Sequence, residues 1–371
     1  MKAGNEFSFD LFQNIYISDK KSDNIMVSPL SVSLALAMTY NGAAGKTKSD
    51  MEKTLRVYGL SPEDINSSYH DLAEALKELD EKVFLRIANA IYYRENFEVE
   101  KSFIATNKQY YRADVAPLDF GSDEAVDIIN KWVYEHTNGK IEKIIDEITP
   151  LHIMFLLNAI YFKGTWQQEF NEKSTGLQQF YPEPGISIDC ETMQRLDTLA
   201  YMSNDIFSAI ILPYGKGNFN MTLFLPEPEK DLQEIIDRLN KENWKKWMDS
   251  FKITESVDIK LPKFKYEYEI MLNDVLTEMG MGIAFTGQAD FTGINRLGDM
   301  LIDYVKHKSF IEVNEEGTEA AAVTVVAIER LSVGGPAKIP FYVNRPFMYV
   351  ITEKSTDAIL FIGTVKNPNS N

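Results

Sequence analysis

The 371-residue chain is poor in the residue types on which several classes of protein depend. It has a single cysteine, Cys190, so no disulfide can form within the chain and a cysteine-rich metal site is excluded. Its four histidines form no His-Glu-x-x-His motif and no pair four residues apart, so we expect no metal site. We interpret Cys190 as an ordinary side chain, because a nucleophilic thiol would need a nearby base and a lowered pKa.

Basic residues are also scarce relative to acidic ones. The 38 lysines and arginines stand against 55 aspartates and glutamates, which gives a formal net charge of −17. Because a phosphate backbone is bound by lysine and arginine, we expect no nucleic-acid partner. No stretch approaches the roughly 18 uninterrupted apolar residues of a membrane span. The chain also lacks the common hydrolase and nucleotide-binding motifs, so we do not expect it to be an enzyme.

Apolar residues are abundant enough for a large core. Hydrophobic residues make up 44% of the chain and aromatic residues 12%, which excludes disorder of the whole chain. There is no internal repeat and no low-complexity linker, so we predict one domain over residues 1–371. The first third is predicted to be mainly helical, because Ser28-Pro29 and Ser61-Pro62 are each typical of a helix N-terminus. The run from Leu30 to Met38 is apolar nearly all round, which predicts a buried helix.

Short apolar runs rich in β-branched and aromatic residues predict strands in the remainder of the chain. The predicted strands cover residues 84–93, 154–162, 209–212, 221–225, 257–261, 310–313, 323–328, 347–352 and 359–362. Helices come first and strands later, without a strict alternation of the two. This order indicates an α+β fold with a mostly antiparallel sheet.

The segment 315–328, EEGTEAAAVTVVAI, has the most unusual composition in the chain. A glycine is followed by small residues and then by β-branched ones, with no proline. As a strand it would place one set of residues on a single face, namely Thr318, Ala320, Ala322, Thr324, Val326 and Ile328. That face starts small and grows larger, which suits a narrow slot in an existing sheet. The local pattern leaves two other interpretations open: an alanine-rich helix capped by Thr318, and a fixed core strand over 323–328.

Many short motifs, in one order from about Phe7 to Pro368, are similar to those of the serpin family, and of its bacterial members in particular. They are Asn24–Ser31, Asn41–Thr47, Asn130–Val133, Thr137–Ile141, Leu157–Trp166, Leu261–Phe264, Ala289–Ile294, His307–Asn314, Asn344–Phe347 and Phe361–Gly363. Each motif alone is weak evidence. Their number and order identify the chain as resembling a serpin over almost its whole length.

The resemblance implies a fold of three β-sheets and about nine helices, with an exposed reactive loop at about residues 315–340. It implies a suicide-substrate inhibitor of serine proteases, in which the cleaved loop inserts into the central sheet and traps the acyl-enzyme. Such a molecule is made in a metastable state. A non-inhibitory serpin acting as a carrier or chaperone is the alternative.

The resemblance also implies roles for particular residues, which fall into three groups. The hinge, where insertion starts, comprises Glu315, Gly317, Thr318, Glu319, Ala320, Ala321, Ala322 and Val323. The shutter, where polar side chains bridge parting strands, comprises Ser28, Ser31, Asn158 and His307. The breach, where the loop first enters, comprises Trp166, Lys263 and Glu315. Small hinge residues are expected of inhibitory members, so the inhibitory interpretation is favoured.

The family's usual spacing from the hinge glutamate places the reactive bond between Leu331 and Ser332. A spacing shorter by one residue would place the bond between Arg330 and Leu331. A leucine before the cut favours a chymotrypsin-like or subtilisin-like protease, whereas an arginine would suit a trypsin-like one. The segment 332–336 makes the distal side of the loop longer than in common members of the family.

The remaining expectations concern partners and surroundings. Residues 70–82 are mostly acidic where some serpins carry a basic helix, so we expect no heparin-type cofactor and no other cofactor. We expect a monomer that forms loop–sheet polymers on heating, because 320–328 is uncharged and of largely β character. An extracellular or cell-surface location is favoured for such an inhibitor, although the chain shows no leader and a cytoplasmic location stays open.

Overall fold

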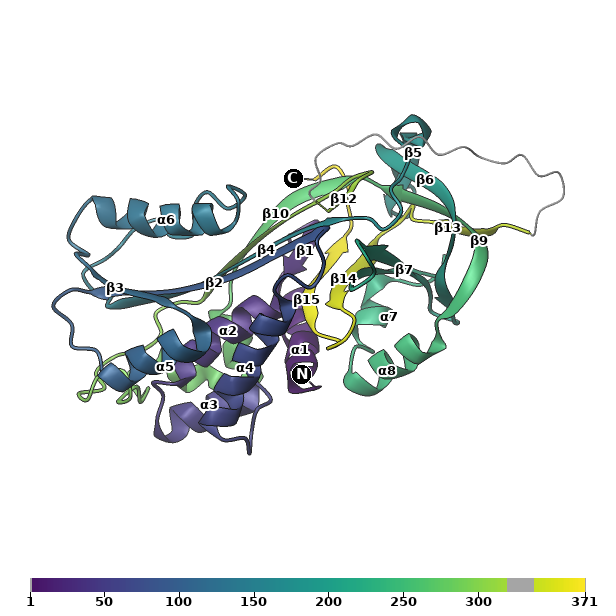
Figure 1. The fold of residues 1–371 in the computed structure, drawn as a ribbon. Coiled ribbons are helices and arrows are strands. Elements are labelled where there is room, and N and C mark those ends of the chain that lie inside the picture. The colour runs from purple at the N-terminus through teal and green to yellow at the C-terminus, as the bar shows by residue number, and fades with distance from the viewer. Residues whose placement is uncertain (1, 319–336, 371) are drawn as a thin grey trace.

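The computed structural model describes residues 2–318 and 337–370, and within them helices pack on the faces of two hydrogen-bonded strand networks (Figure 1). Nine α-helices are formed by these residues, in agreement with the number implied by the resemblance. They are α1 (Lys2–Ser18), α2 (Pro29–Tyr40), α3 (Gly45–Thr54), α4 (Pro62–Leu76), α5 (Lys101–Tyr111), α6 (Glu124–His136), α7 (Leu232–Ile236), α8 (Lys241–Ser250) and α9 (Asn273–Leu276).

Two of these helices begin where the sequence predicted. The Ser28 hydroxyl accepts a hydrogen bond from the backbone N–H of Ser31 at 3.2 Å, and Pro29 is the first helical residue of α2. Ser61 caps α4 in the same way. Each cap satisfies a backbone donor that has no partner inside the helix. Nearly every residue of α2 is buried, as its apolar sequence indicated.

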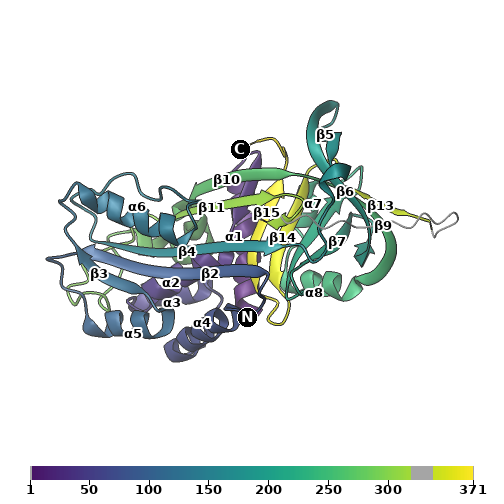
Figure 2. The same cartoon turned by 45° about the horizontal axis from the view of Figure 1, so that its top comes forward.

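A six-stranded sheet forms the long central layer of the molecule. Its strand order is β10 (Phe264–Met271), β11 (Lys306–Val313), β12 (Gly317–Thr318), β4 (Met154–Thr165), β2 (Val83–Arg94) and β3 (Asp114–Leu118). Neighbouring strands are antiparallel except β2 and β3, which are parallel. Figure 2 shows α6 lying over this sheet and α2 beneath it.

The other network has nine strands. Eight form the order β1 (Asn24–Val27), β15 (Ile359–Val365), β14 (Phe347–Glu353), β8 (Phe219–Pro226), β7 (Phe207–Tyr214), β6 (Ile186–Ser203), β9 (Lys252–Pro262) and β13 (Ile339–Tyr342), and β5 (Gly176–Glu183) pairs with β6. The long strand β6 connects the two parts of this network: residues 192–201 pair with β9, and residues 200–203 pair with β7. Helices and mostly antiparallel strands occur in separate stretches of the chain, so the predicted α+β fold is confirmed.

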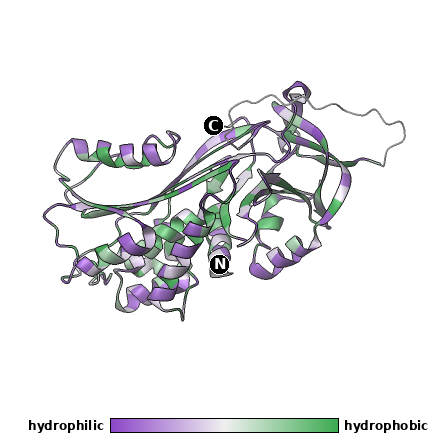
Figure 3. Ribbon diagram, viewed as in Figure 1, coloured by the Kyte–Doolittle hydropathy of each residue, from purple (hydrophilic) through white to green (hydrophobic). Residues whose placement is uncertain are grey.

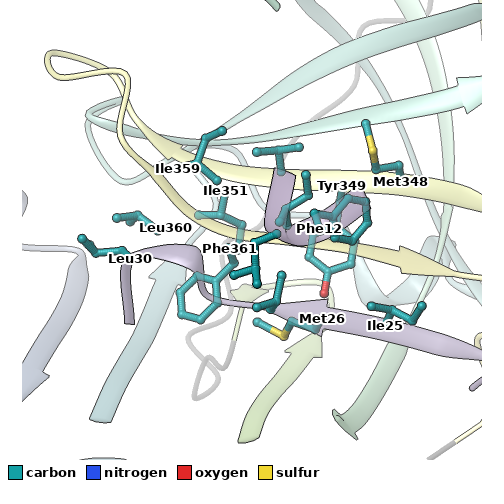
Figure 4. Close-up of a cluster of buried hydrophobic side chains, with 14 of the residues drawn as sticks. Phe12, Ile25, Met26, Leu30, Met348, Tyr349, Ile351, Ile359, Leu360 and Phe361 are labelled. Atoms are coloured by element: carbon teal, nitrogen blue, oxygen red, sulfur yellow. The ribbon is translucent and has the colours of Figure 1, made fainter. Parts of the chain in front are cut away.

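The main core lies between α1, α2 and the strands β14 and β15. Figure 4 shows this cluster, in which Phe12, Leu30, Tyr349 and Phe361 pack together and are almost completely buried. In Figure 3 hydrophobic residues gather in this interior, whereas an outer helix such as α8 is largely hydrophilic. No helix of the described residues is long and apolar enough to cross a membrane.

The strand predictions within the described residues were confirmed, although most of them were too short. The sequence missed the buried strand β1, the hairpin β5–β6, and the helices α5 and α6. The hairpin was missed because its residues are mostly exposed and polar, so they show no clean alternation of apolar and polar residues. The strand predicted over 323–328 lies outside the described residues.

Candidate functional site

Strands β4 and β11 of the six-stranded sheet are separated by β12, which is only two residues long. Gly317 and Thr318 pair with Thr165 and Gly164 of β4, and Thr318 also pairs with Val313 of β11. Beyond Thr318 no pairing joins β4 to β11 anywhere in the described residues. We call the space between the two strands the slot. Within the part of the chain that the structure describes, the backbone N–H and C=O groups of both strands that face the slot have no ladder partner beyond β12, and these are the groups that an added strand would bind.

The slot continues into a cavity of about 860 Å³. Its walls come from α2, from α6 and the segment that follows it, from β4, from β11 and from the segment 287–305. Met154, Leu156 and Ile160 of β4 contribute apolar side chains, and Asn158 and His307 contribute polar ones. The cavity is therefore mostly apolar with a few polar groups, a composition that suits a strand of small and β-branched side chains.

The first hinge residues already lie in the sheet. Gly317 has a φ of 153°, and a Cβ atom there would sit 2.0 Å from the carbonyl oxygen of Gly164, so only glycine fits. Thr318 is 3% exposed, and its hydroxyl lies 2.6 Å from the hydroxyl of Tyr214. Thr318 is therefore a strand residue directed into the core, whereas the alanine-rich helix of the alternative interpretation lies outside the described residues.

The three predicted breach residues meet beside β12. Lys263 Nζ lies 3.3 Å from Glu315 Oε2 and 3.3 Å from Glu191 Oε2. The hydroxyl of Thr175 donates to Glu315 Oε1 at 2.7 Å. Burial by itself would raise the pKa of the Glu315 carboxyl, but Thr175 and Lys263 outweigh burial and hold that pKa below its ordinary value. Glu315 is thus kept ionised at the entrance of the slot.

Trp166 fixes the chain on the other side of the entrance. Its indole N–H donates to the carbonyl of Asn314 at 3.0 Å, and its backbone N–H donates to the carbonyl of Glu316 at 2.8 Å. Its ring stacks on Tyr214, with centroids 4.4 Å apart and an angle of 12° between the planes. Tyr214, which also contacts Thr318, therefore links the Trp166 ring to the hinge.

The shutter residues lie under the middle of the slot. His307 is buried, and its Nε2 accepts a hydrogen bond from the backbone N–H of Ser28 at 3.1 Å. This bond places the imidazole proton on Nδ1. Burial lowers the pKa of His307 to about 4, so the side chain is neutral near pH 7. Ser28 thereby joins the start of α2 to β11, while its hydroxyl caps the helix through Ser31.

Asn158, the shutter residue of β4, contacts the neighbouring strand β2. Its amide donates to the side-chain oxygen of Asn89 on β2 at 2.7 Å, and Asn89 in turn donates to the carbonyl of Tyr111. No bond joins Asn158 to His307 or to the serines within the described residues. The buried Asn158 side-chain oxygen has no hydrogen-bond partner there. It therefore remains available to a donor that enters the slot.

The structure assembles the breach in full and the shutter in two halves, one on each side of the slot. Sequence reasoning missed Tyr214, Thr175 and Asn89, which contact the predicted residues from other elements. These three residues lie outside the motifs quoted for the resemblance, whereas the residues they contact lie inside the predicted groups. The sequence therefore offered no reason to select them. Predicted residues Glu319, Ala320, Ala321, Ala322, Val323, Arg330, Leu331 and Ser332 lie outside the described residues. No cluster of three metal-binding side chains occurs in the described part of the chain.

The structure thus contains a central sheet with a slot, a glycine at the entrance where no residue with a side chain fits, and buried polar groups on both sides. Comparisons with known proteins identify the class of protein to which such a structure belongs. The family model described as "Serpin (serine protease inhibitor)" matches residues 2–368. The chain therefore belongs to the serpin family, whose members are generally protease inhibitors and not enzymes.

Individual relatives cover the whole chain. Intracellular coagulation inhibitor 2 of Tachypleus tridentatus is 34% identical over 98% of this chain and 90% of its own. The crystal structure of a thermophilic serpin, tengpin, in the native state has a TM-score of 0.88 at 36% identity and covers 99% of this chain and 93% of its own. Thyroxine-binding globulin in complex with thyroxine has a TM-score of 0.88 at 26% identity and covers 100% and 99%.

Proposed function

We propose that the chain is a suicide-substrate inhibitor of serine proteases. The protease serine attacks the carbonyl of the residue before the reactive bond, forming an ester and releasing the amine of the residue after it. The hinge then inserts between β4 and β11 and carries the acylated protease along. The observation that carries this proposal is that β12 already occupies the entrance of the slot, while the rest of the slot has no pairing among residues 2–318 and 337–370.

The register of β12 supports insertion of the following residues. Extending both ladders by six residues takes Thr318 to Thr324, Gly164 to Asn158 and Val313 to His307. In an inserted strand with this register, Thr324 would come between the two halves of the shutter. Its hydroxyl could donate to the Asn158 oxygen that has no partner among the described residues.

The length of the segment also fits the proposal. The 15 residues from Gly317 to Leu331, counted along the sequence, would span roughly 50 Å as a strand at about 3.3 Å per residue. Such a strand would move a protease attached to its end from one end of the sheet toward the other. We therefore propose Leu331–Ser332 as the reactive bond, with Arg330–Leu331 as the alternative.

Insertion would be favourable because the slot is mostly apolar and its edges have no pairing beyond β12 among the described residues. Each added backbone hydrogen bond contributes about 0.5–1.5 kcal/mol net, and buried apolar area contributes about 25 cal/mol per Å². Over such a strand, the gain is comparable with the ~5–15 kcal/mol stability of an ordinary domain. A kinetic barrier must therefore hold the state in which only β12 is in place.

A carrier function is the second candidate. It is favoured by the likeness to thyroxine-binding globulin, which is solved with thyroxine, a small ligand. Two observations disfavour the carrier function. The hinge sequence consists of small residues, and Gly317 and Thr318 are buried at the slot entrance. Neither feature would be needed if the loop never inserted.

Incubation with chymotrypsin, subtilisin and trypsin tests the proposal. An inhibitor gives a covalent complex that survives SDS, and mass spectrometry of the released C-terminal peptide identifies the reactive bond by its first residue. Subtilisin and chymotrypsin are expected to form the complex in preference to trypsin. A cleaved loop with fully active protease in all three mixtures would refute inhibition and favour the carrier.

A further inference from the structure

A second cavity lies on the side of the central sheet that faces away from α6. Its volume is about 240 Å³, and its walls come mainly from α4, α5 and β2. Figure 1 shows both helices beneath that strand, with α6 on the opposite side. We call this space the helix cavity. Its lining residues and those of the cavity at the slot do not overlap, so the two are separate sites.

The inner wall of the helix cavity is apolar. Leu85 and Ile87 line it from one face of β2, because they are two residues apart on the strand. Ala73 and Leu76 line it from α4. Leu85 and Ile87 are only half-buried, so the chain itself leaves part of their apolar surface uncovered. The hydrocarbon part of a small ligand gains affinity by covering such a surface.

Several polar groups that line the helix cavity already have partners within the chain. Asn89 Nδ2 donates to the carbonyl of Tyr111 at 2.7 Å, and its oxygen accepts the bond from β4 described above. The Tyr111 hydroxyl donates to Asn66 Oδ1 at 2.7 Å. His70 Nδ1 donates to the carbonyl of Tyr110 at 3.1 Å, since a carbonyl can only accept. These groups need no polar partner from a ligand, so an apolar group suits the space between them.

Charged side chains stand at the mouth of the helix cavity. Glu74 Oε2 lies 2.7 Å from Arg112 Nη2, and Glu74 Oε1 lies 2.7 Å from Lys77 Nζ. All three residues line the cavity and are partly exposed. Two positive charges thus meet one negative charge, whereas the whole chain carries a net charge of −17. A guanidinium has five N–H donors and an ammonium three, so both cations keep donors for a further acceptor after contacting Glu74.

We propose that the helix cavity binds a medium-chain carboxylate. The alkyl chain lies against β2 and α4, and the carboxylate accepts hydrogen bonds from Arg112 and Lys77. At about 30 Å³ for each water-sized group, a cavity of about 240 Å³ holds about eight such groups, which matches the eight carbons of octanoate. The single excess positive charge at the mouth suits a monoanion. This binding activity does not depend on the proposed inhibitory function.

Isothermal titration calorimetry with sodium butanoate, hexanoate, octanoate and dodecanoate tests the apolar part of the site. Each methylene group that becomes buried raises the affinity about fourfold, so octanoate should bind about fifteenfold more tightly than hexanoate. Dodecanoate should gain no further affinity, because its additional carbons exceed the space. Equal affinities for butanoate and octanoate would overturn the proposal. A steady rise up to dodecanoate would indicate an open apolar surface in place of a cavity and would also refute it.

Arg112→Gln tests the charged part of the site. Loss of a charge-assisted hydrogen bond should weaken octanoate binding about tenfold. Octan-1-ol has the same chain and no charge, so it should bind the wild type and the variant equally. Arg296→Gln is the matched control, because Arg296 is also exposed and pairs with Glu100 at 2.9 Å but does not line the helix cavity. It should leave the octanoate affinity unchanged, and equal losses in both variants would refute the site.

Ala73→Leu tests whether the ligand occupies the helix cavity. The larger side chain takes up space at the inner wall, so the variant should lose octanoate binding. A cooperative thermal transition without ligand confirms that the variant is folded. If it does not fold, Arg112→Gln still tests the site. Wild-type affinity for octanoate in folded Ala73→Leu would place the ligand elsewhere and overturn the proposal.

Discussion

At the scale of single residues, the site is organised by buried polar groups whose partners lie on different elements. Thr318 contacts Tyr214, Asn158 contacts Asn89, and His307 contacts Ser28. Each of these pairs joins the six-stranded sheet to a neighbouring element or one strand to the next. A buried polar group without a partner costs about 1–3 kcal/mol. Any movement of the sheet that breaks one of these contacts must therefore give the polar group a new partner.

His307 makes the stability of the molecule depend on pH. Its pKa is about 4 in the folded protein and near 6.5 in the unfolded chain, where burial is lost. Between these values the unfolded chain binds more protons, so the free energy of unfolding falls as the pH is lowered from 6.5 toward 4. The contribution of this group reaches about 3 kcal/mol. Urea denaturation at pH 7 and pH 4.5 measures it.

The variant His307→Gln isolates this contribution. Glutamine does not titrate, so the difference in unfolding free energy between pH 7 and pH 4.5 should be about 2–3 kcal/mol smaller in the variant than in the wild type. The other three histidines are unchanged in the comparison and cancel. An identical pH dependence in both proteins would show that His307 is not the group responsible.

At the scale of elements, β12 is the point where sequence and structure give the same answer. The sequence predicted that Thr318 would face inward if its segment became a strand, and the structure shows this residue buried in β12. The larger strands were predictable because their apolar runs are long. The breach and shutter partners were not, because contacts such as Tyr214–Thr318 join residues 104 positions apart and leave no local pattern.

Thr318→Arg should convert the inhibitor into a substrate. The residue is 3% exposed and lies against Tyr214, so a guanidinium would have to enter the core without a partner. Insertion would stop at the entrance, and the protease would be released after cleaving the loop. SDS gels of mixtures with the target protease should show cleaved inhibitor and no covalent complex.

The conservative change Thr318→Ser provides the control for this prediction. Serine keeps the hydroxyl that meets Tyr214 and fits the same space, so the covalent complex should persist. If Thr318→Arg still inhibited with unchanged stoichiometry, the entrance at β12 would not be the route of insertion.

At the scale of the whole molecule, the slot between β4 and β11 implies two states of different stability. In one state only Gly317 and Thr318 complete the ladders, and the remaining backbone groups along the slot are unpaired in the described residues. In the other, an added strand would satisfy them and fill a cavity of about 860 Å³. The segment from Gly317 to Leu331 has enough residues to supply that strand.

Nicking the loop should therefore raise the Tm by tens of degrees. The cut releases the end of the hinge segment, and the added hydrogen bonds and buried apolar area then favour a single more stable form. For a chain of this size, about 1 kcal/mol corresponds to only a few degrees or less, so a gain of many kcal/mol is needed and an inserted strand can supply it. Scanning calorimetry of intact and nicked protein measures the shift, with the nick confirmed by mass spectrometry.

The nicked form of Thr318→Arg is the matched comparison, because it carries the same cut but cannot insert, and its Tm should stay near that of the intact protein. If the wild-type Tm were the same before and after the nick, the slot would not be the receptor of the loop, and the energy for trapping a protease would have no source in this fold.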